Sequence, residues 1–142
     1  MDASTITSAF KTVSITFAIA AVTTGLQALT SPVSFATSFG IPLSQHGRSQ
    51  KSKASPNAEA GINLAYIKVM GARQFATGIT LLVFAYQGKW VEMATVLVIV
   101  GSIVAGMDGY QIAQNGSLGG GLFHAVPGWL IAALATAMLR YS

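Results

Sequence analysis

This sequence has few charged residues and no cysteine. Only 8% of its 142 residues are charged and none is cysteine, whereas an ordinary soluble domain has roughly 25% charged residues. The absence of cysteine excludes a disulfide framework and a thiolate metal site, and it removes thiol usage as a guide to the redox compartment. Hydrophobic residues, in contrast, make up 52% of the chain. This balance is typical of a protein embedded in a membrane.

Acidic residues are scarce as well, and the net charge is +4. A basic chain can indicate nucleic-acid binding, but here the basic residues cluster in SQHGRSQKSK, between apolar segments and without interleaved aromatic residues. A loop beside anionic lipid headgroups explains this pattern better. We therefore expect the lipid bilayer, and not nucleic acid, as the partner of this stretch.

Four apolar segments are long enough to span a membrane, for which about 20 predominantly apolar residues are needed. They cover approximately residues 6–29, 62–86, 91–112 and 122–139. The short links QGKW and AQNGSLGGG predict antiparallel neighbours. The fold expected for residues 1–142 is therefore a single all-α domain, an integral membrane up-and-down four-helix bundle. Between the first two spans, the sequence predicts a short amphipathic piece between Pro32 and Pro42 and a polar loop over residues 44–60.

Small residues recur every four positions in the third segment, at Gly101, Ala105 and Gly109. This spacing is typical of membrane helices that approach one another closely. A glycine-rich chain also produces such a spacing by chance, and the sequence leaves both explanations open.

Polar side chains line one face of each of the first two predicted helices. The first face comprises Thr12, Thr16, Thr23 and Gln27, and the second comprises Asn63, Tyr66, Met70, Arg73, Thr77 and Thr80. Because a polar stripe on a membrane helix usually points toward protein, we expect both faces to line the bundle interior. The candidate substrate-binding residues are Gln27, Asn63, Tyr66, Met70 and Thr77, together with Gln111 of the third helix.

Three ionisable residues interrupt the apolar segments: Arg73 in GARQFATG, Asp108 in VAGMDGYQ and His124 in LFHAVPGWL. With four spans, all three fall in the same half of the bilayer. An ionisable group at the bilayer centre costs roughly 2.5 to 3.5 kcal/mol on insertion scales, so it is normally paired and often functional. Arg73 and Asp108 are the natural partners. The alternative to a functional site is a buried ion pair that only fixes the register of the bundle.

A carboxylate, an imidazole and a guanidinium within an apolar pocket suit acid–base chemistry on a lipophilic small-molecule substrate. Asp108 would be the base or nucleophile, His124 the proton donor, and Arg73 would stabilise charge, as in the hydrolytic or cyclising opening of an epoxide. Isomerisation or cyclisation of a polyene or terpenoid by proton transfer is an alternative. So is a noncatalytic membrane protein that binds a lipophilic ligand. A single histidine in the cluster argues against a metal site, and no cofactor is expected.

The motifs GARQFATG, AGMDGYQ and FHAVPGWL resemble those of a family of small four-helix integral membrane proteins common in fungi, over residues 61–139. Some of its members are similar to small membrane epoxide hydrolases and cyclases of polyketide and terpenoid pathways. The resemblance implies an enzyme of secondary metabolism in which Arg73, Asp108 and His124 are the functional positions.

Basic residues also indicate an orientation. The loop between the first two spans carries Arg48, Lys51 and Lys53, whereas Lys11, Lys89 and Arg140 on the opposite side have the acidic residues Asp2 and Glu92 nearby. The positive-inside rule then predicts that this loop and the mouth of the site face the cytosol. We expect the endoplasmic reticulum membrane as the location, and a homo-oligomer remains open.

Overall fold

The computed structural model describes residues 2–38, 56–115 and 118–141, without the side chains of residues 56–63 and 115. Its elements are α1 (Ala3–Thr30), α2 (Pro32–Ser38), α3 (Pro56–Tyr86), α4 (Trp90–Ile99), the π-helix η1 (Val100–Val104), α5 (Ala105–Asn115) and α6 (Leu118–Tyr141). Within these ranges there is no strand, and the all-α class is confirmed. Four helical stretches are long and apolar enough to cross a membrane: α1, residues Leu64–Tyr86 of α3, the continuous run Trp90–Gln114, and α6.

Each predicted span coincides with one of these helices, and the largest difference in bounds is at the start of α3. This helix begins at Pro56, because proline fits the first turn, where its missing N–H would have no helical partner. Residues 56–60 are therefore helical and not part of the predicted polar loop. The remainder of that loop, residues 44–55, lies outside the described residues. The short piece predicted after Pro32 is present as α2.

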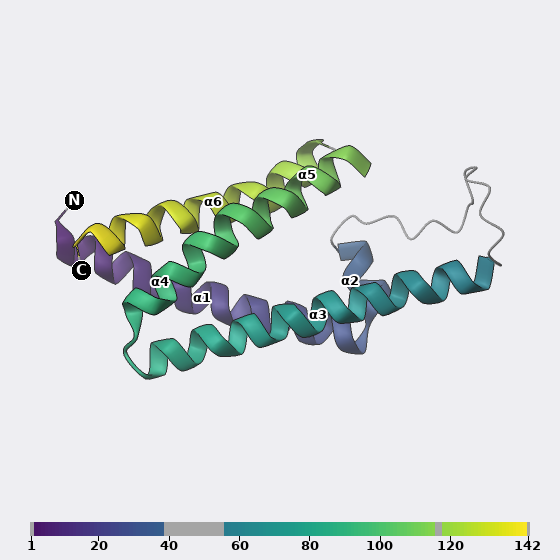
Figure 1. The fold of residues 1–142 in the computed structure, drawn as a ribbon, viewed down its shortest axis with the longest axis horizontal. Coiled ribbons are helices and arrows are strands. Elements are labelled where there is room, and N and C mark those ends of the chain that lie inside the picture. The colour runs from purple at the N-terminus through teal and green to yellow at the C-terminus, as the bar shows by residue number, and fades with distance from the viewer. Residues whose placement is uncertain (1, 39–55, 116–117, 142) are drawn as a thin grey trace.

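The four spans pack as two antiparallel pairs. α1 lies along α3, and the run of α4, η1 and α5 lies along α6 (Figure 1). The pairs meet near the chain termini and the turn between α3 and α4, and they diverge toward α2 and the end of α5 (Figure 1). The second and third spans are thus antiparallel, as predicted, but they are neighbours mainly near their turn, where Gly88 has a φ of 70°.

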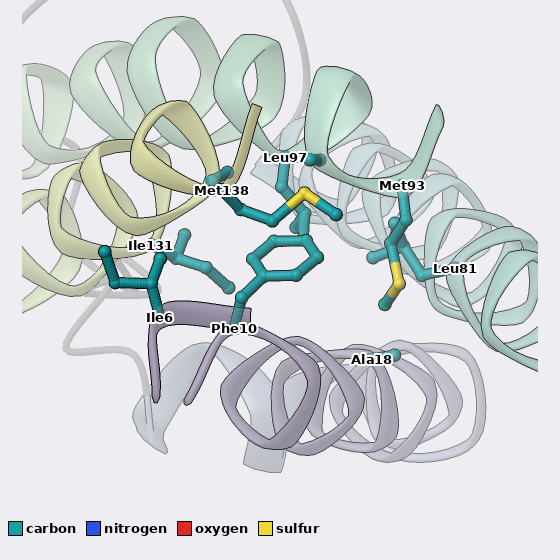
Figure 2. Close-up of a cluster of buried hydrophobic side chains, with 10 residues drawn as sticks. Ile6, Phe10, Ala18, Leu81, Met93, Leu97, Ile131 and Met138 are labelled. Atoms are coloured by element: carbon teal, nitrogen blue, oxygen red, sulfur yellow. The ribbon is translucent and has the colours of Figure 1, made fainter. Parts of the chain in front are cut away.

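The main hydrophobic core lies at the end of the molecule where all four spans meet. Its largest fully buried apolar side chains are Phe10, Leu81, Met93 and Leu97, which come from α1, α3 and α4. Figure 2 shows the ring of Phe10 extending from α1 toward Leu97 and Met138. A smaller cluster of Ala28, Phe35, Ala36 and Ile67 packs α2 against α1 and α3 at the other end.

Glycines set the separation between α1 and α3. A Cβ placed on Gly25 would lie 2.5 Å from the backbone nitrogen of Phe75, and one on Gly78 would lie 2.7 Å from the backbone nitrogen of Val22. Side chains at these positions would push the two backbones apart. The close contact therefore depends on residues without a Cβ, as is common where membrane helices pack.

Small residues set the separation between α5 and α6 as well. A Cβ on Gly109 would lie 2.7 Å from the carbonyl oxygen of Gly121, Gly101 abuts the carbonyl of Gly128, and Ala105 also contacts Gly128. The four-residue spacing of Gly101, Ala105 and Gly109 is therefore a packing motif and not a chance feature of a glycine-rich chain.

The polar face predicted for α1 does not point into the bundle. Thr12, Thr16 and Thr23 are exposed, and their hydroxyls donate to carbonyls of their own helix. The buried face of α1 consists instead of Ile6, Phe10, Ser14, Ala18, Ala21, Gly25 and Ala28. The prediction fails because a threonine that bonds to its own backbone needs no partner on another helix and can face lipid.

The outer surface of the spans is apolar. Side chains such as Ile19, Ile103 and Leu130 are exposed, which in a soluble protein would indicate an interaction surface but which suits the hydrocarbon of a bilayer. At the end where the spans meet, the Lys11 ammonium lies over the Trp90 ring, 4.9 Å from its centroid. A cation and an indole together are typical of the membrane interface.

Candidate functional site

The three predicted ionisable residues lie on three different spans, in the half of the molecule where the helix pairs diverge. Asp108 is six residues before the end of its candidate span at Gln114, and His124 is six residues after Leu118. At 1.5 Å per residue, each lies about 9 Å along its helix from that end. Arg73 lies 13 residues before Tyr86, the end of α3, or about 20 Å from the turn between α3 and α4. Asp108, which lies 18 residues after Trp90, is about 27 Å from the same turn.

Asp108 and His124 flank one crossing of α5 and α6. Their neighbours touch, since a Cβ placed on Gly109 would lie 2.7 Å from the Cβ of Ala125. Both Asp108 and His124 are half-buried. The Asp108 carboxylate interacts electrostatically with His124 and, less strongly, with Arg73. Charged groups on α3 and α6 thus act on the carboxylate of α5.

The hydrogen bond of the His124 ring fixes its tautomer. Nδ1 lies 2.9 Å from the carbonyl oxygen of Gly120, one turn earlier in α6. A carbonyl only accepts, so Nδ1 carries the hydrogen and donates it. The acceptor of the neutral ring is then Nε2. A second proton binds at Nε2, and the imidazolium so formed can deliver it to a substrate.

The Arg73 guanidinium acts on the Asp108 carboxylate over a distance, and the two side chains do not form a direct ion pair. The Arg73 side chain is exposed on α3, and between these two described residues there is no direct ion pair. The direct Arg73–Asp108 pair expected from the sequence is therefore not formed. The physical reason is that α3 and α5 belong to different helix pairs, which diverge at this level (Figure 1).

The stripe predicted on α3 lies outside the contact with α1. Tyr66 is 67% exposed and Met70 is 48% exposed, while the hydroxyl of Thr77 donates to the carbonyl of Arg73 at 2.9 Å. The contact with α1 is formed instead by a neighbouring face that contains Gly71 and Gly78. The stripe is therefore not packed into the interior as predicted, although it carries the residue whose charge acts on Asp108.

The other three predicted binding residues are Gln27, Gln111 and Asn63. Gln27 is half-buried on α1 and Gln111 is exposed on α5, and the side chain of Asn63 lies outside the described residues. Among the predicted binding residues that the structure describes, Met70 and Thr77 lie about one turn from Arg73 in α3, and Gln111 lies about one turn from Asp108 in α5.

Two features near Asp108 were not predicted from the sequence. The π-helix η1 ends four residues before Asp108, and Trp129 of α6 is 52% exposed. Its indole nitrogen would lie 3.4 Å from a Cβ on Gly106, one turn before Gly109. The four-residue spacing of Gly101, Ala105 and Gly109 does not reveal η1, because the same spacing is typical of regular membrane helices. Only the contacts of all three residues with α6 show it.

The described parts of the chain contain no group of three histidine, aspartate or glutamate side chains that could hold a metal ion. Four helices that are long and apolar enough to cross a membrane indicate a helical integral membrane protein. Residues 18–138 match a family described as a domain of unknown function, DUF4267, and the chain belongs to that family. The match includes all three residues of the cluster. No curated protein and no solved structure shows a significant match.

Proposed function

We propose that this protein is a membrane enzyme that opens or cyclises an epoxide of a lipophilic intermediate by acid–base catalysis. The acid–base part rests on one observation: half-buried Asp108 and His124 lie next to Gly109 and Ala125, which touch where two spans cross, and Arg73 lies on a third span. The epoxide part is supported by the resemblance of the three motifs to small membrane epoxide hydrolases and cyclases. A lipophilic substrate fits the apolar surface that surrounds the cluster.

In the hydrolytic version, Asp108 accepts a proton from a water whose oxygen attacks one epoxide carbon. The bond between that carbon and the epoxide oxygen breaks, and the oxygen takes the Nε2 proton of the His124 imidazolium, so that epoxide and water give a diol. Arg73 stabilises negative charge on the oxygen as the bond breaks. A hydroxyl of the substrate replaces water in the cyclising version. Transfer of the proton from Asp108 back to His124 completes the cycle.

The proposed location is the endoplasmic reticulum membrane, with the end of the spans nearest the cluster toward the cytosol. The support is the excess of basic residues in the loop between α1 and α3 and the positive-inside rule. A substrate made by soluble enzymes could then enter from the cytosolic leaflet.

The first test replaces Asp108 by asparagine, which keeps the size of the side chain and removes the base. Microsomes that contain Asp108→Asn should convert a panel of lipophilic epoxides at least about 100-fold more slowly than wild type, the usual contribution of a general base. Glu92→Gln is the matched control, because Glu92 is an exposed acid in the first turn of the same span. Product is measured by mass spectrometry in ¹⁸O-labelled water. Undiminished conversion by Asp108→Asn would refute the assignment.

The same experiment separates the two alternatives. Oxygen from water in the product identifies the hydrolytic version. In a product without it, an epoxide opened by the substrate's own hydroxyl identifies the cyclising version, whereas a moved double bond or a closed carbon ring identifies isomerisation or cyclisation by proton transfer. A noncatalytic binding protein, which the exposed Tyr66 and Met70 beside Arg73 favour, would give no product from any variant. It would still bind a lipophilic epoxide, and binding should weaken in Met70→Ala.

A further inference from the structure

The π-helix η1 adds one residue to the third span immediately before the candidate site. The backbone N–H of Ala105 donates to the carbonyl of Val100, five residues earlier instead of four. Such a single-turn insertion breaks the α-helical repeat and often lies at a functional site. Each residue of an α-helix turns by about 100°, so one extra residue changes the direction of every side chain that follows. η1 therefore affects the direction of Asp108.

The direction that Asp108 would otherwise have can be found by counting from Leu97, which is fully buried in the core. Asp108 is eleven residues later in the chain, and in an uninterrupted α-helix eleven residues make about three turns plus 20°. Asp108 would then point the same way as Leu97, into the bundle. In the structure Gly109 occupies the buried contact with α6. The extra residue in η1 has moved Gly109 into the place of Asp108.

That contact has no room for a carboxylate. Even a Cβ on Gly109 would lie 2.7 Å from the carbonyl oxygen of Gly121 and 2.7 Å from the Cβ of Ala125. Asp108 instead lies at the edge of the contact, half-buried, where the charges of His124 and Arg73 act on it.

We propose that η1 is a positioning device that turns the Asp108 carboxylate out of the contact between α5 and α6 and presents it to His124 and Arg73. Its effect on catalysis rests on the proposed function, whereas its effect on the direction of Asp108 does not. The residues concerned act through Asp108 and are not themselves catalytic.

Deletion of Ser102, which is exposed and lies within η1, is the matched control. Removal of one residue should convert the π turn into α-helix and leave Asp108 ten residues after Leu97, about 80° away from it, which is the direction that η1 already gives Asp108. The direct test adds to this deletion an alanine between Gly106 and Met107. In this shifted variant Asp108 is again eleven residues after Leu97, now without a π turn, and should rotate by about 100° toward the contact with α6. A second shifted variant inserts one alanine after Ser102 without any deletion and should rotate Asp108 by about 100° in the same sense.

The natural absence of cysteine allows a readout that does not depend on activity. Nitroxide labels on Asp108→Cys and Arg73→Cys in reconstituted protein should show dipolar broadening in the parent and in the deletion variant. The broadening should be weaker in the two shifted variants. Where one shifted variant does not fold, the other is compared instead. Equal broadening in the parent and in the shifted variants would overturn the proposal.

Turnover is measured on the same backbones with Asp108 and Arg73 present. The shifted variants should lose activity as Asp108→Asn does, at least about 100-fold, and the deletion variant should keep most of it. A change in broadening with no turnover in any variant, the parent included, would reject the proposed enzyme and support the positioning role. Full turnover in a variant whose labels have moved apart would overturn the catalytic importance of the direction of Asp108.

Discussion

Arg73 and Asp108 do not form a direct ion pair with each other, and this decides what substitution of Arg73 should cost in stability. Breaking a buried ion pair leaves the other charge uncompensated and destabilises a protein by roughly 3 to 5 kcal/mol. Arg73, however, is exposed and makes no direct ion pair with Asp108, both of which are described residues. A role in holding the bundle together therefore does not fit the geometry of Arg73.

We accordingly expect Arg73→Met to change the free energy of unfolding by less than about 1 kcal/mol and to abolish turnover. His124→Ala should behave in the same way, because functional groups are often retained at some expense to stability. Melting temperature and product formation are measured on detergent-solubilised wild type, Arg73→Met, Asp108→Leu, His124→Ala and the double variant Arg73→Met, Asp108→Leu. An active His124→Ala, or a double variant much more stable than either single variant, would favour a structural ion pair over a catalytic cluster.

At the scale of elements, the helix pairs depend on glycines and not on large side chains. Gly25 faces the backbone of α3 at Phe75, and Gly109 faces the carbonyl of Gly121. Lipid tails are as apolar as leucine, so apolar side chains gain little by leaving lipid for another helix, and close van der Waals contact must supply the attraction. Small residues permit that contact.

The matched pair Gly25→Ala and Gly119→Ala tests this account with one and the same substitution. A methyl on Gly25 meets backbone atoms of α3, whereas a methyl on Gly119 meets nothing within 4 Å. Gly25→Ala should destabilise the protein by about 1 to 3 kcal/mol, the usual cost of overpacking. Gly119→Ala should be neutral or stabilising by up to about 1 kcal/mol, since alanine is the better helix residue. Thermal unfolding in detergent measures both, and equal melting temperatures would contradict the packing account.

At the scale of the whole molecule, the main hydrophobic core and the candidate site lie at different ends of the spans. The main core lies where all four spans meet, and Asp108 and His124 lie toward the end where the two pairs diverge (Figure 1). A site at the diverging end can carry polar groups without disturbing the core. Both chain termini lie at the other end, together with Lys11 and Trp90.

The four candidate spans and the basic loop between α1 and α3 together give a prediction about membrane orientation. A glycosylation acceptor at the carboxyl terminus should be modified in microsomes, and one at Ser52, in the loop between α1 and α3, should not, because the basic residues of that loop keep it in the cytosol. Gel mobility before and after deglycosylation reports the result. The reverse pattern would invert the orientation, and modification of both acceptors in one molecule would contradict a four-span topology.

The sequence alone determined the number, order and approximate limits of the spans, because the length of an apolar run is fixed by the thickness of the bilayer. It also placed Arg73, Asp108 and His124 in one half of the molecule, which follows from span order alone. The spacing of Gly101, Ala105 and Gly109 was visible, although only the contact with Gly128 and Gly121 showed it to be a packing motif.

Only the tertiary structure decided which helix faces touch and where Asp108 points. The threonine face of α1 and the stripe of Tyr66 and Met70 on α3 were both predicted to be buried, and both are largely exposed. In a membrane, hydropathy does not distinguish a side chain that faces lipid from one that faces protein, so steric fit at the glycines makes that choice. The direction of Asp108 depends in turn on the single extra residue in η1, which no hydrophobic pattern records.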